Sequence, residues 1–278
     1  MPAHEESARI LSVAVDAIGG TPRSGQVEMA QAVDRAIDEE IHLLVQAGTG
    51  TGKSLGYLAP TIAHAVLDDE AVVVATATLA LQAQLAGKDI PAAPTAAEKV
   101  LPRRPRAAVL KGRHNHVCLH KVRGGSSRPD QDMLLDDAES SAAGSAGKGT
   151  DQASELGAEV VALRQWAEQQ AEENGIGDRD DAPAHSQQAW DQVSMRANEC
   201  LGAQNCPFGS QCLAERARER ARDADIVVTN HAMLAIDAMN GGTLLPEHDV
   251  VVIDEAHEVA DRFTGAASVD LWPGRLST

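Results

Sequence analysis

The chain has 278 residues, 43% of them apolar, and a formal net charge of −17. No run approaches the roughly 20 apolar residues that a membrane-spanning helix needs, and the opening MPAHEESARI lacks the basic-then-apolar pattern of a signal peptide. We therefore expect a cytoplasmic protein of one large or two small domains, in a reducing compartment where structural disulfides are rare.

Charge is distributed unevenly along the chain. Residues 101–128 contain eight Lys or Arg and no Asp or Glu, whereas residues 130–199 contain 16 acids and four bases. The net charge alone argues against a nucleic-acid partner. We call residues 101–128 the basic island. Its local positive charge makes a nucleic-acid partner possible again.

The first 112 residues predict an α/β unit. Apolar residues at three- and four-residue steps predict helices over 5–18 and 26–41. The apolar run 42–46 predicts a strand that leads into a glycine-rich turn and a helix from Lys53. The β-branched run 71–78 predicts a buried strand, and 106–112 a weaker one.

The middle third departs from this pattern. Residues 124–129 and 141–150 are typical of loops or linkers, while 153–173 and 213–225 predict helices. Buried strands are again predicted within 225–230 and 248–254. The middle third therefore reads as an insert in one α/β domain.

The segment AGTGTGKS, residues 47–54, nearly matches the P-loop pattern, with Ala47 where a glycine is usual. Backbone N–H groups of such a loop surround phosphate oxygens, Lys53 reaches the β- and γ-phosphates, and Ser54 offers its hydroxyl to Mg²⁺. The predicted nucleotide-binding residues of the loop are Ala47, Gly48, Thr49, Gly50, Thr51, Gly52, Lys53 and Ser54. A merely flexible turn is the structural alternative.

The segment VVVIDEAHE places Asp254 and Glu255 directly after a predicted buried strand. Ligands of open α/β sheets bind at this carboxyl edge. We expect Asp254 to hold Mg²⁺ and Glu255 to orient or deprotonate the attacking water. On its own the pair would also suit an ordinary helix start.

Cys118, Cys200, Cys206 and Cys212 are the four cysteines. Structural zinc sites usually use close pairs with two to four residues between the ligands, and this chain has none. Four thiolates are the number that a [4Fe–4S] cluster takes. The spacing alone leaves zinc and an iron–sulfur cluster open.

The motif combination resembles the XPD-like iron–sulfur DNA helicases of the DEAH type. AGTGTGKS and DEAH (254–257) are similar to helicase motifs I and II, and the cysteines with VVTNHAML (227–234) narrow the resemblance. RSGQVEM is similar to the adenine-reading Q-motif, which implies that Arg23 and Gln26 contact the base. TATLALQAQL (76–85) is similar to motif Ia, which touches single-stranded DNA.

This resemblance implies an ATP-dependent 5′-to-3′ DNA helicase with a RecA-like P-loop domain, acting in replication or repair. It implies Lys53, Asp254, Glu255 and His257 as catalytic residues, with His257 coupling hydrolysis to DNA. Its cofactors would be ATP, Mg²⁺ on Ser54 and Asp254, and a [4Fe–4S] cluster on the four cysteines. Its partner would be single-stranded, forked or flapped DNA. The protein would bind this DNA as a monomer.

Two features depart from the family pattern. Gln46 stands where relatives often have Glu, and nothing after residue 278 supplies the arch or the second motor domain with its arginine finger. We expect an amino-terminal portion with the first motor domain at 1–112 and 224–278, interrupted by an iron–sulfur insert at 113–223. Alone it would bind nucleotide and turn over little ATP.

The basic island and the arginines after Cys212 could track a phosphate backbone, although three Trp, one Tyr and two Phe leave little for base stacking. The bland alternative is a surface that balances the acidic segment. We expect His114, His116 and His120 to face solvent or phosphate. Two other functions remain open: a non-motor nucleotide-, cluster- and DNA-binding fragment with little or no ATPase activity, and a zinc-stabilised P-loop ATPase.

Overall fold

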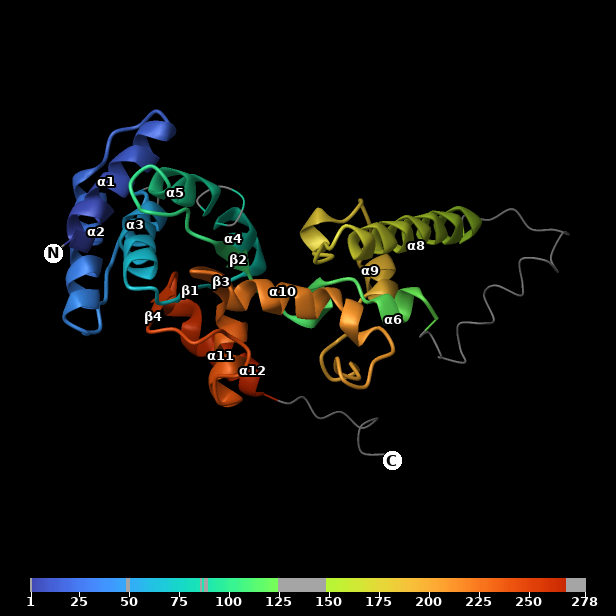
Figure 1. Ribbon diagram of the computed structural model, residues 1–278. Helices are drawn as coiled ribbons and strands as arrows, with labels where there is room; N and C mark the ends of the chain where they lie inside the picture. Colours follow the sequence, from blue (N-terminus) through green and yellow to red (C-terminus); the bar gives the residue numbers. More distant parts are fainter. Residues whose placement is uncertain (1, 49–50, 86, 88–89, 125–148, 269–278) are drawn as a thin grey trace, which may run out of the picture. The chain divides into compact units, whose positions relative to one another are not determined.

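The computed structural model describes residues 2–48, 51–85, 87, 90–124 and 149–268 (Figure 1). The chain divides into two compact units. Unit 1 comprises residues 1–111 and 218–278, and unit 2 comprises residues 112–217. The loops predicted at 124–129 and 141–150 lie almost entirely outside the described residues.

Unit 1 is built on a parallel sheet with the strand order β2-β3-β1-β4. Its strands are β1 (Val72–Thr76), β2 (Ala107–Val109), β3 (Ile226–Asn230) and β4 (Val250–Ile253). Val73 pairs in register with Val227 on one side and with Val251 on the other. The predicted α/β class with a parallel sheet is therefore confirmed, and all four strands end at the same edge.

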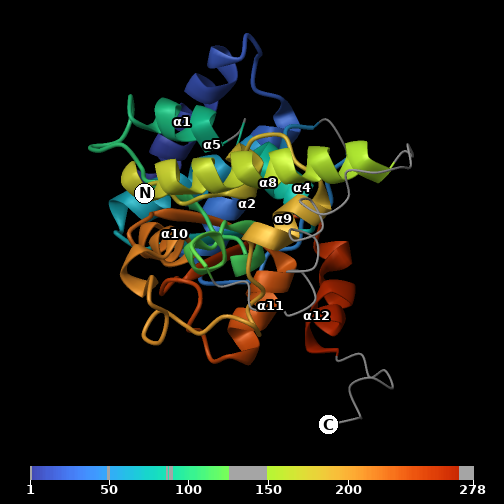
Figure 2. The same ribbon diagram turned by 90° about the vertical axis from the view of Figure 1, so that its right-hand side faces the viewer.

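Helices cover both faces of this sheet. Unit 1 contains α1 (Pro2–Ala17), α2 (Ser24–Asp38), α3 (Lys53–Leu67), α4 (Leu79–Gln84), α5 (Ile90–Ala97), α11 (His231–Met239) and α12 (Val259–Ala267). Helix α10 (Leu213–Arg222) contains the boundary between the units. Helices α11 and α12 lie side by side in both views (Figures 1 and 2).

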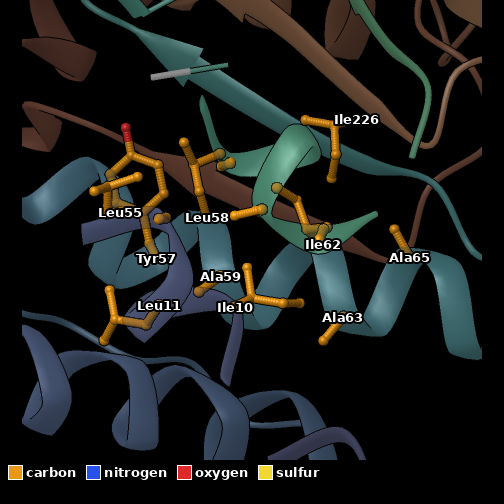
Figure 3. Close-up of a cluster of buried hydrophobic side chains, with 14 of the residues drawn as sticks. Ile10, Leu11, Leu55, Tyr57, Leu58, Ala59, Ile62, Ala63, Ala65 and Ile226 are labelled. Atoms are coloured by element: carbon orange, nitrogen blue, oxygen red, sulfur yellow. The ribbon is translucent and has the colours of Figure 1, made fainter. Parts of the chain in front are cut away.

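The main core of unit 1 lies on the α1 and α3 side of the sheet. Helix α3 lies between α1, which contributes Ile10 and Leu11, and the sheet, which contributes Ile226 (Figure 3). Leu58 and Ile62 of α3 are fully buried there. Successive strand residues point to opposite faces, so Val73 and Val227 instead pack in a second cluster with Met233 of α11.

The strand predicted over 42–46 is wrong. Residues 41–48 form no helix or strand, and Leu44 is 94% exposed. A strand requires ladder hydrogen bonds to a neighbouring strand. The edge strands of the described sheet are β2 and β4, and segment 42–46 pairs with neither of them.

Unit 2 has its own small core. Its helices are α6 (Leu119–Val122), α8 (Gly149–Glu172) and α9 (Gln187–Val193), with α10 beginning at Leu213. Trp190 and Leu163 are fully buried in the cluster that these helices form. The indole Nε1 of Trp190 donates to the carbonyl of His114 at 2.7 Å, which satisfies its polar end.

Among the described residues, no helix combines the length and apolarity that crossing a membrane requires.

Candidate functional site

The P-loop segment lies at the amino end of α3. Thr51 Oγ1 donates to the Gly48 carbonyl at 2.8 Å, and α3 begins at Lys53. Gly52 has a left-handed φ of 79°, which a side chain disfavours. Thr49 and Gly50, which the sequence also predicts as phosphate-binding, lie outside the described residues.

Gln26 joins α2 to this loop. Its Nε2 donates to the Gly52 carbonyl at 3.1 Å, and its Oε1 accepts from the Arg23 backbone N–H at 3.1 Å. The side chain is buried. Gln26 is thus adjacent to the P-loop, with both ends of its carboxamide engaged by the protein, while Arg23 is exposed.

Lys53 meets the carboxylates that follow β4. Its Nζ lies 2.5 Å from Glu255 Oε1 and 3.8 Å from Asp254 Oδ1. The hydrogen bond with Lys53 lowers the pKa of Glu255, and the same bond raises the pKa of Lys53. Residues 202 positions apart in sequence are therefore brought together with opposite charges at the carboxyl edge of the sheet.

Asp254 is held by several contacts. Its Oδ1 accepts from the Glu255 backbone N–H at 3.0 Å, and its Oδ2 has a long contact of 3.4 Å with the Tyr57 hydroxyl. Its backbone carbonyl accepts from His231 Nε2 at 2.9 Å. Glu255 itself has a left-handed φ of 54°, unusual for a residue with a side chain.

His231 is a candidate that sequence reasoning left out of the site, because helix packing explained it equally well. It begins α11, directly after β3, and is 0% exposed. Its place in the segment VVTNHAML, one residue after a strand that ends at the ligand edge, was the available signal. Sequence could not reveal that its ring reaches the backbone of Asp254.

The donor set suits a Mg²⁺ ion shared with a nucleotide. Among the described residues, no three His, Cys, Asp or Glu side chains gather closely enough to hold a metal ion on their own. Mg²⁺ in phosphate-transfer sites does not need such a cage, because it uses one or two protein ligands with waters and phosphates. Asp254 and Ser54 provide ligands of that kind.

His257 lies on the solvent side of this edge. It is 72% exposed on its side chain, and its Nδ1 is 3.5 Å from Glu255 Oε2. This contact links His257 to Glu255, another predicted catalytic residue. The exposure leaves the His257 ring accessible to solvent.

The four cysteines all belong to unit 2 and form no disulfide. Cys118, Cys200 and Cys212 interact electrostatically, and burial raises the pKa of the Cys118 thiol. Arg113, whose guanidinium pairs with Glu215, interacts electrostatically with Cys200 and Cys212. Four thiolates are the donor type and the number that a [4Fe–4S] cluster takes. Among the described residues, however, no three of them gather closely enough to hold a metal ion.

Much of the basic island is engaged by acids of the chain itself. Arg103 forms a two-pronged pair with the buried Asp225 at 2.6 and 3.0 Å. Burial alone raises the pKa of Asp225, but the bonds from Arg103 and from the Arg106 backbone outweigh it, and the pKa lies below its usual range. Similar contacts pair Arg104 with Glu98, Arg113 with Glu215 and Arg123 with Glu168.

These pairings change how the basic island is interpreted. A guanidinium that already neutralises a carboxylate has less to offer a phosphate. Lys111 is buried, and Lys121 donates to the Asp191 carbonyl at 3.0 Å. Of these pairs, only that of Arg123 with Glu168 involves the acidic segment 130–199, so the other paired arginines are balanced by acids elsewhere in the chain. In the arginine-rich α10, Arg216 contacts the carbonyls of Gln170 and Ala171 at the end of α8.

The expectation that His116 faces solvent or phosphate is wrong. Its ring is buried, and its Nδ1 bonds to the Ile176 carbonyl at 3.0 Å. His114 contacts Ser194 Oγ at 3.1 Å, and burial lowers its pKa. Both rings therefore take part in the packing of unit 2, which their local sequence did not reveal.

Comparisons with known proteins give one matching family model and several similar helicases. The family model DEAD_2 matches residues 106–276. The chain is 48% identical to the ATP-dependent helicase DinG of Mycobacterium tuberculosis over 96% of its own length and 39% of the relative's. It is 35% identical to the ATP-dependent DNA helicase YoaA of Escherichia coli over 87% of its own length and 34% of the relative's.

A third relative, the ATP-dependent DNA helicase DinG of Photobacterium profundum, is 30% identical over 89% of this chain and 34% of its own. The chain thus spans about two fifths or less of the length of these relatives. The family model covers more than half of the chain. The chain belongs to the DEAD_2 family.

Proposed function

We propose that this chain is the ATP-binding portion of a DinG-type, ATP-dependent DNA helicase, with a RecA-like motor domain in unit 1. The observation that carries the proposal is the meeting of Lys53 with Asp254 and Glu255 at the carboxyl edge of a parallel sheet. A loop lysine and two strand-end carboxylates are the groups that phosphoryl transfer needs for positioning and charge stabilisation.

Each residue of the site has a distinct task in this proposal. The loop from Ala47 to Ser54 binds the phosphates through backbone N–H groups and Lys53. Bound Mg²⁺, held by Ser54 and Asp254, would neutralise phosphate charge. Glu255 orients the attacking water once Lys53 turns from it to the nucleotide. Arg23 and Gln26 read the adenine, and Gln26 is bonded to the loop at Gly52.

In this proposal the exposed His257 couples nucleotide hydrolysis to DNA contact. Its contact with Glu255 supports this role, because a ring that touches the catalytic carboxylate and also faces solvent can respond to both. Unwinding in the 5′-to-3′ direction, forked or flapped DNA as substrate, and action as a monomer in replication or repair belong to the same proposal.

Unit 2 holds a [4Fe–4S] cluster on Cys118, Cys200, Cys206 and Cys212 in this proposal. The support is the four thiols in one unit, three of which interact electrostatically. Such a cluster would stabilise the loop that carries three of its ligands. A single zinc ion would require four thiolates to converge in a tetrahedron.

The test of function compares nucleotide binding and hydrolysis with and without single-stranded DNA. Lys53→Ala should abolish ATP binding, whereas the control Lys99→Ala, an exposed lysine of unit 1, should not. In the whole protein, single-stranded DNA should stimulate hydrolysis. Tight ATP binding by Lys53→Ala would reject the site, and an ATPase indifferent to DNA would favour the non-motor reading.

That second candidate, a nucleotide-, cluster- and DNA-binding module with little turnover, has one observation in its favour. Lys53 and Glu255, two groups that ATP hydrolysis would use, form an ion pair with each other. We expect the 278-residue chain to bind nucleotide with little hydrolysis. Both candidates predict this, so stimulation by DNA in the whole protein distinguishes them.

A further inference from the structure

His231 reaches across the sheet edge to the residue proposed to hold Mg²⁺. It follows β3, whereas Asp254 follows β4, and β1 lies between these two strands. The ring is fully buried, and its Nε2 lies 2.9 Å from the Asp254 carbonyl oxygen. A carbonyl only accepts hydrogen bonds, so Nε2 carries the proton and donates it.

The peptide group between Asp254 and Glu255 is held from both of its ends. Its carbonyl accepts from His231, and its N–H donates to Asp254 Oδ1 at 3.0 Å. The chain turns immediately afterwards into the left-handed conformation of Glu255, with φ 54°. That conformation is unfavourable for a non-glycine residue, so external bonds must hold the turn.

This turn decides where both carboxylates point. Asp254 contacts Tyr57 and lies near Lys53, while Glu255 pairs directly with Lys53. Rotation of the peptide group would move both side chains together, because it joins their Cα atoms. Fixing its carbonyl therefore fixes the relative placement of the proposed metal ligand and the proposed base.

The other ring nitrogen argues against a role in packing alone. Nδ1 of His231 is buried without a hydrogen-bond partner among the described residues. An unsatisfied buried polar atom costs stability, which an apolar side chain of similar shape would avoid. The backbone that carries the ring is also held, since the preceding Asn230 caps α11 by accepting from the Met233 N–H at 2.9 Å.

We infer that His231 is a positioning residue of the nucleotide site, which orients Asp254 for Mg²⁺ through the Asp254 carbonyl. The inference rests on the proposed ATP site and adds a residue to it. Outer-shell partners of metal ligands typically change metal affinity by about 10- to 100-fold when they are replaced. His231 should therefore affect the Mg²⁺-dependent part of nucleotide affinity and leave Mg²⁺-free binding unchanged.

The experiment measures the affinity of the 278-residue chain for a fluorescent, non-hydrolysable ATP analogue in Mg²⁺ and in EDTA. His231→Gln keeps an amide donor near the Nε2 position. His231→Asn, the matched control, is one methylene shorter and does not reach. We expect the ratio of the two affinities to stay near wild type in His231→Gln and to fall by about tenfold in His231→Asn.

A double-mutant cycle with Asp254→Ala tests whether the effect passes through Asp254. In the Asp254→Ala background, His231→Asn should cause no further loss of the Mg²⁺-dependent gain. An undiminished gain in His231→Asn, or equal losses in the asparagine and glutamine variants, would overturn the positioning role.

Failure of the proposed function gives a different result. A wild-type chain that binds no nucleotide, or an Asp254→Ala variant that keeps the full Mg²⁺ gain, would reject the site itself and the inference with it. Thermal unfolding checks each variant. If His231→Asn does not fold, His231→Met replaces it. If neither folds while His231→Gln does, the bond serves fold stability, which overturns the inference.

Discussion

Lys53 Nζ and Glu255 Oε1 lie 2.5 Å apart, so the P-loop lysine is paired with the carboxylate proposed to activate water. The pair satisfies two charges that nucleotide binding must separate. Lys53 carries three N–H donors, so an incoming phosphate would compete with Glu255 for its positive charge. The proposed catalytic groups are therefore close together and engaged with each other.

Glu255→Gln should tighten nucleotide binding and abolish hydrolysis. The substitution removes the negative charge that competes with phosphate for Lys53, and it also removes the group that orients water. Titration with a fluorescent ATP analogue measures the first effect and phosphate release in the whole protein the second. Glu258→Gln, which breaks the neighbouring pair with Arg262, is the control. Weaker binding by Glu255→Gln would contradict the competition.

The ion pair should also give the stability a defined pH dependence. Lys53 lowers the pKa of Glu255, so this stabilisation is complete above the ordinary glutamate pKa and is lost as the pH falls through the lowered value. For Lys53, whose pKa is raised, it is complete below the ordinary lysine pKa and is lost as the pH rises through the raised value.

Urea unfolding at a series of pH values checks this expectation. The difference in unfolding free energy between wild type and Glu255→Gln should be constant near neutral pH and shrink towards acid. Both side chains are partly exposed, so solvent screening keeps the difference small. A difference that grows on acidification would show that the two groups are not paired in the native state.

Gly52→Ala should weaken nucleotide binding and destabilise unit 1. A Cβ at this position would lie 1.9 Å from Gln26 Nε2, and the backbone has a left-handed φ. The control Gly25→Ala adds a Cβ where no atom lies within 4 Å and φ is not positive. Gln26→Ala removes the side chain that clashes but also loses its bonds to Gly52 and Arg23. Measured against Gln26→Ala alone, adding Gly52→Ala should therefore cost only the backbone strain of about 1–2 kcal/mol.

Arg103→Ala should affect stability more than DNA affinity. It leaves the buried Asp225 with the contacts from Arg106 alone, and loss of a hydrogen bond to a charged group costs roughly 1.5–3 kcal/mol. Arg104→Ala is the control, because its pair with Glu98 is exposed and 3.7 Å long. Urea unfolding and binding to single-stranded DNA at several salt concentrations separate the effects. A large loss of DNA affinity in folded Arg103→Ala would restore the phosphate-tracking role.

Cys118→Ser and Cys212→Ser should each remove most of the bound iron and acid-labile sulfide. A [4Fe–4S] cluster needs about four of each per chain and four thiolates. Anaerobic purification followed by iron, sulfide and zinc analysis gives the measurement, with Asn205→Ala in the same loop as the control. One zinc and no sulfide in the wild-type protein would exclude the cluster.

Local sequence was sufficient for most elements of this fold. The strands β1 to β4 and helix α10 lie within the predicted ranges, and α3 begins at the predicted Lys53. Helices α1, α2 and α8 overlap their predicted ranges but begin two to four residues earlier. These patterns depend on which side of an element is buried, and the spacing of the apolar residues shows which side that is. Segment 42–46 has the composition of a strand, but it lacks a partner within the described sheet, and pairing is not a local property.

The sequence by itself determined which residues are available for chemistry: a P-loop lysine, two carboxylates after a buried strand, and four cysteines. Only the tertiary structure decided how they are paired. It engages Lys53 with Glu255, assigns Arg103 to Asp225, and brings His231 to the Asp254 carbonyl. Each of these contacts joins residues more than 20 positions apart. Their geometry follows from strand order and helix packing, which local patterns leave undetermined.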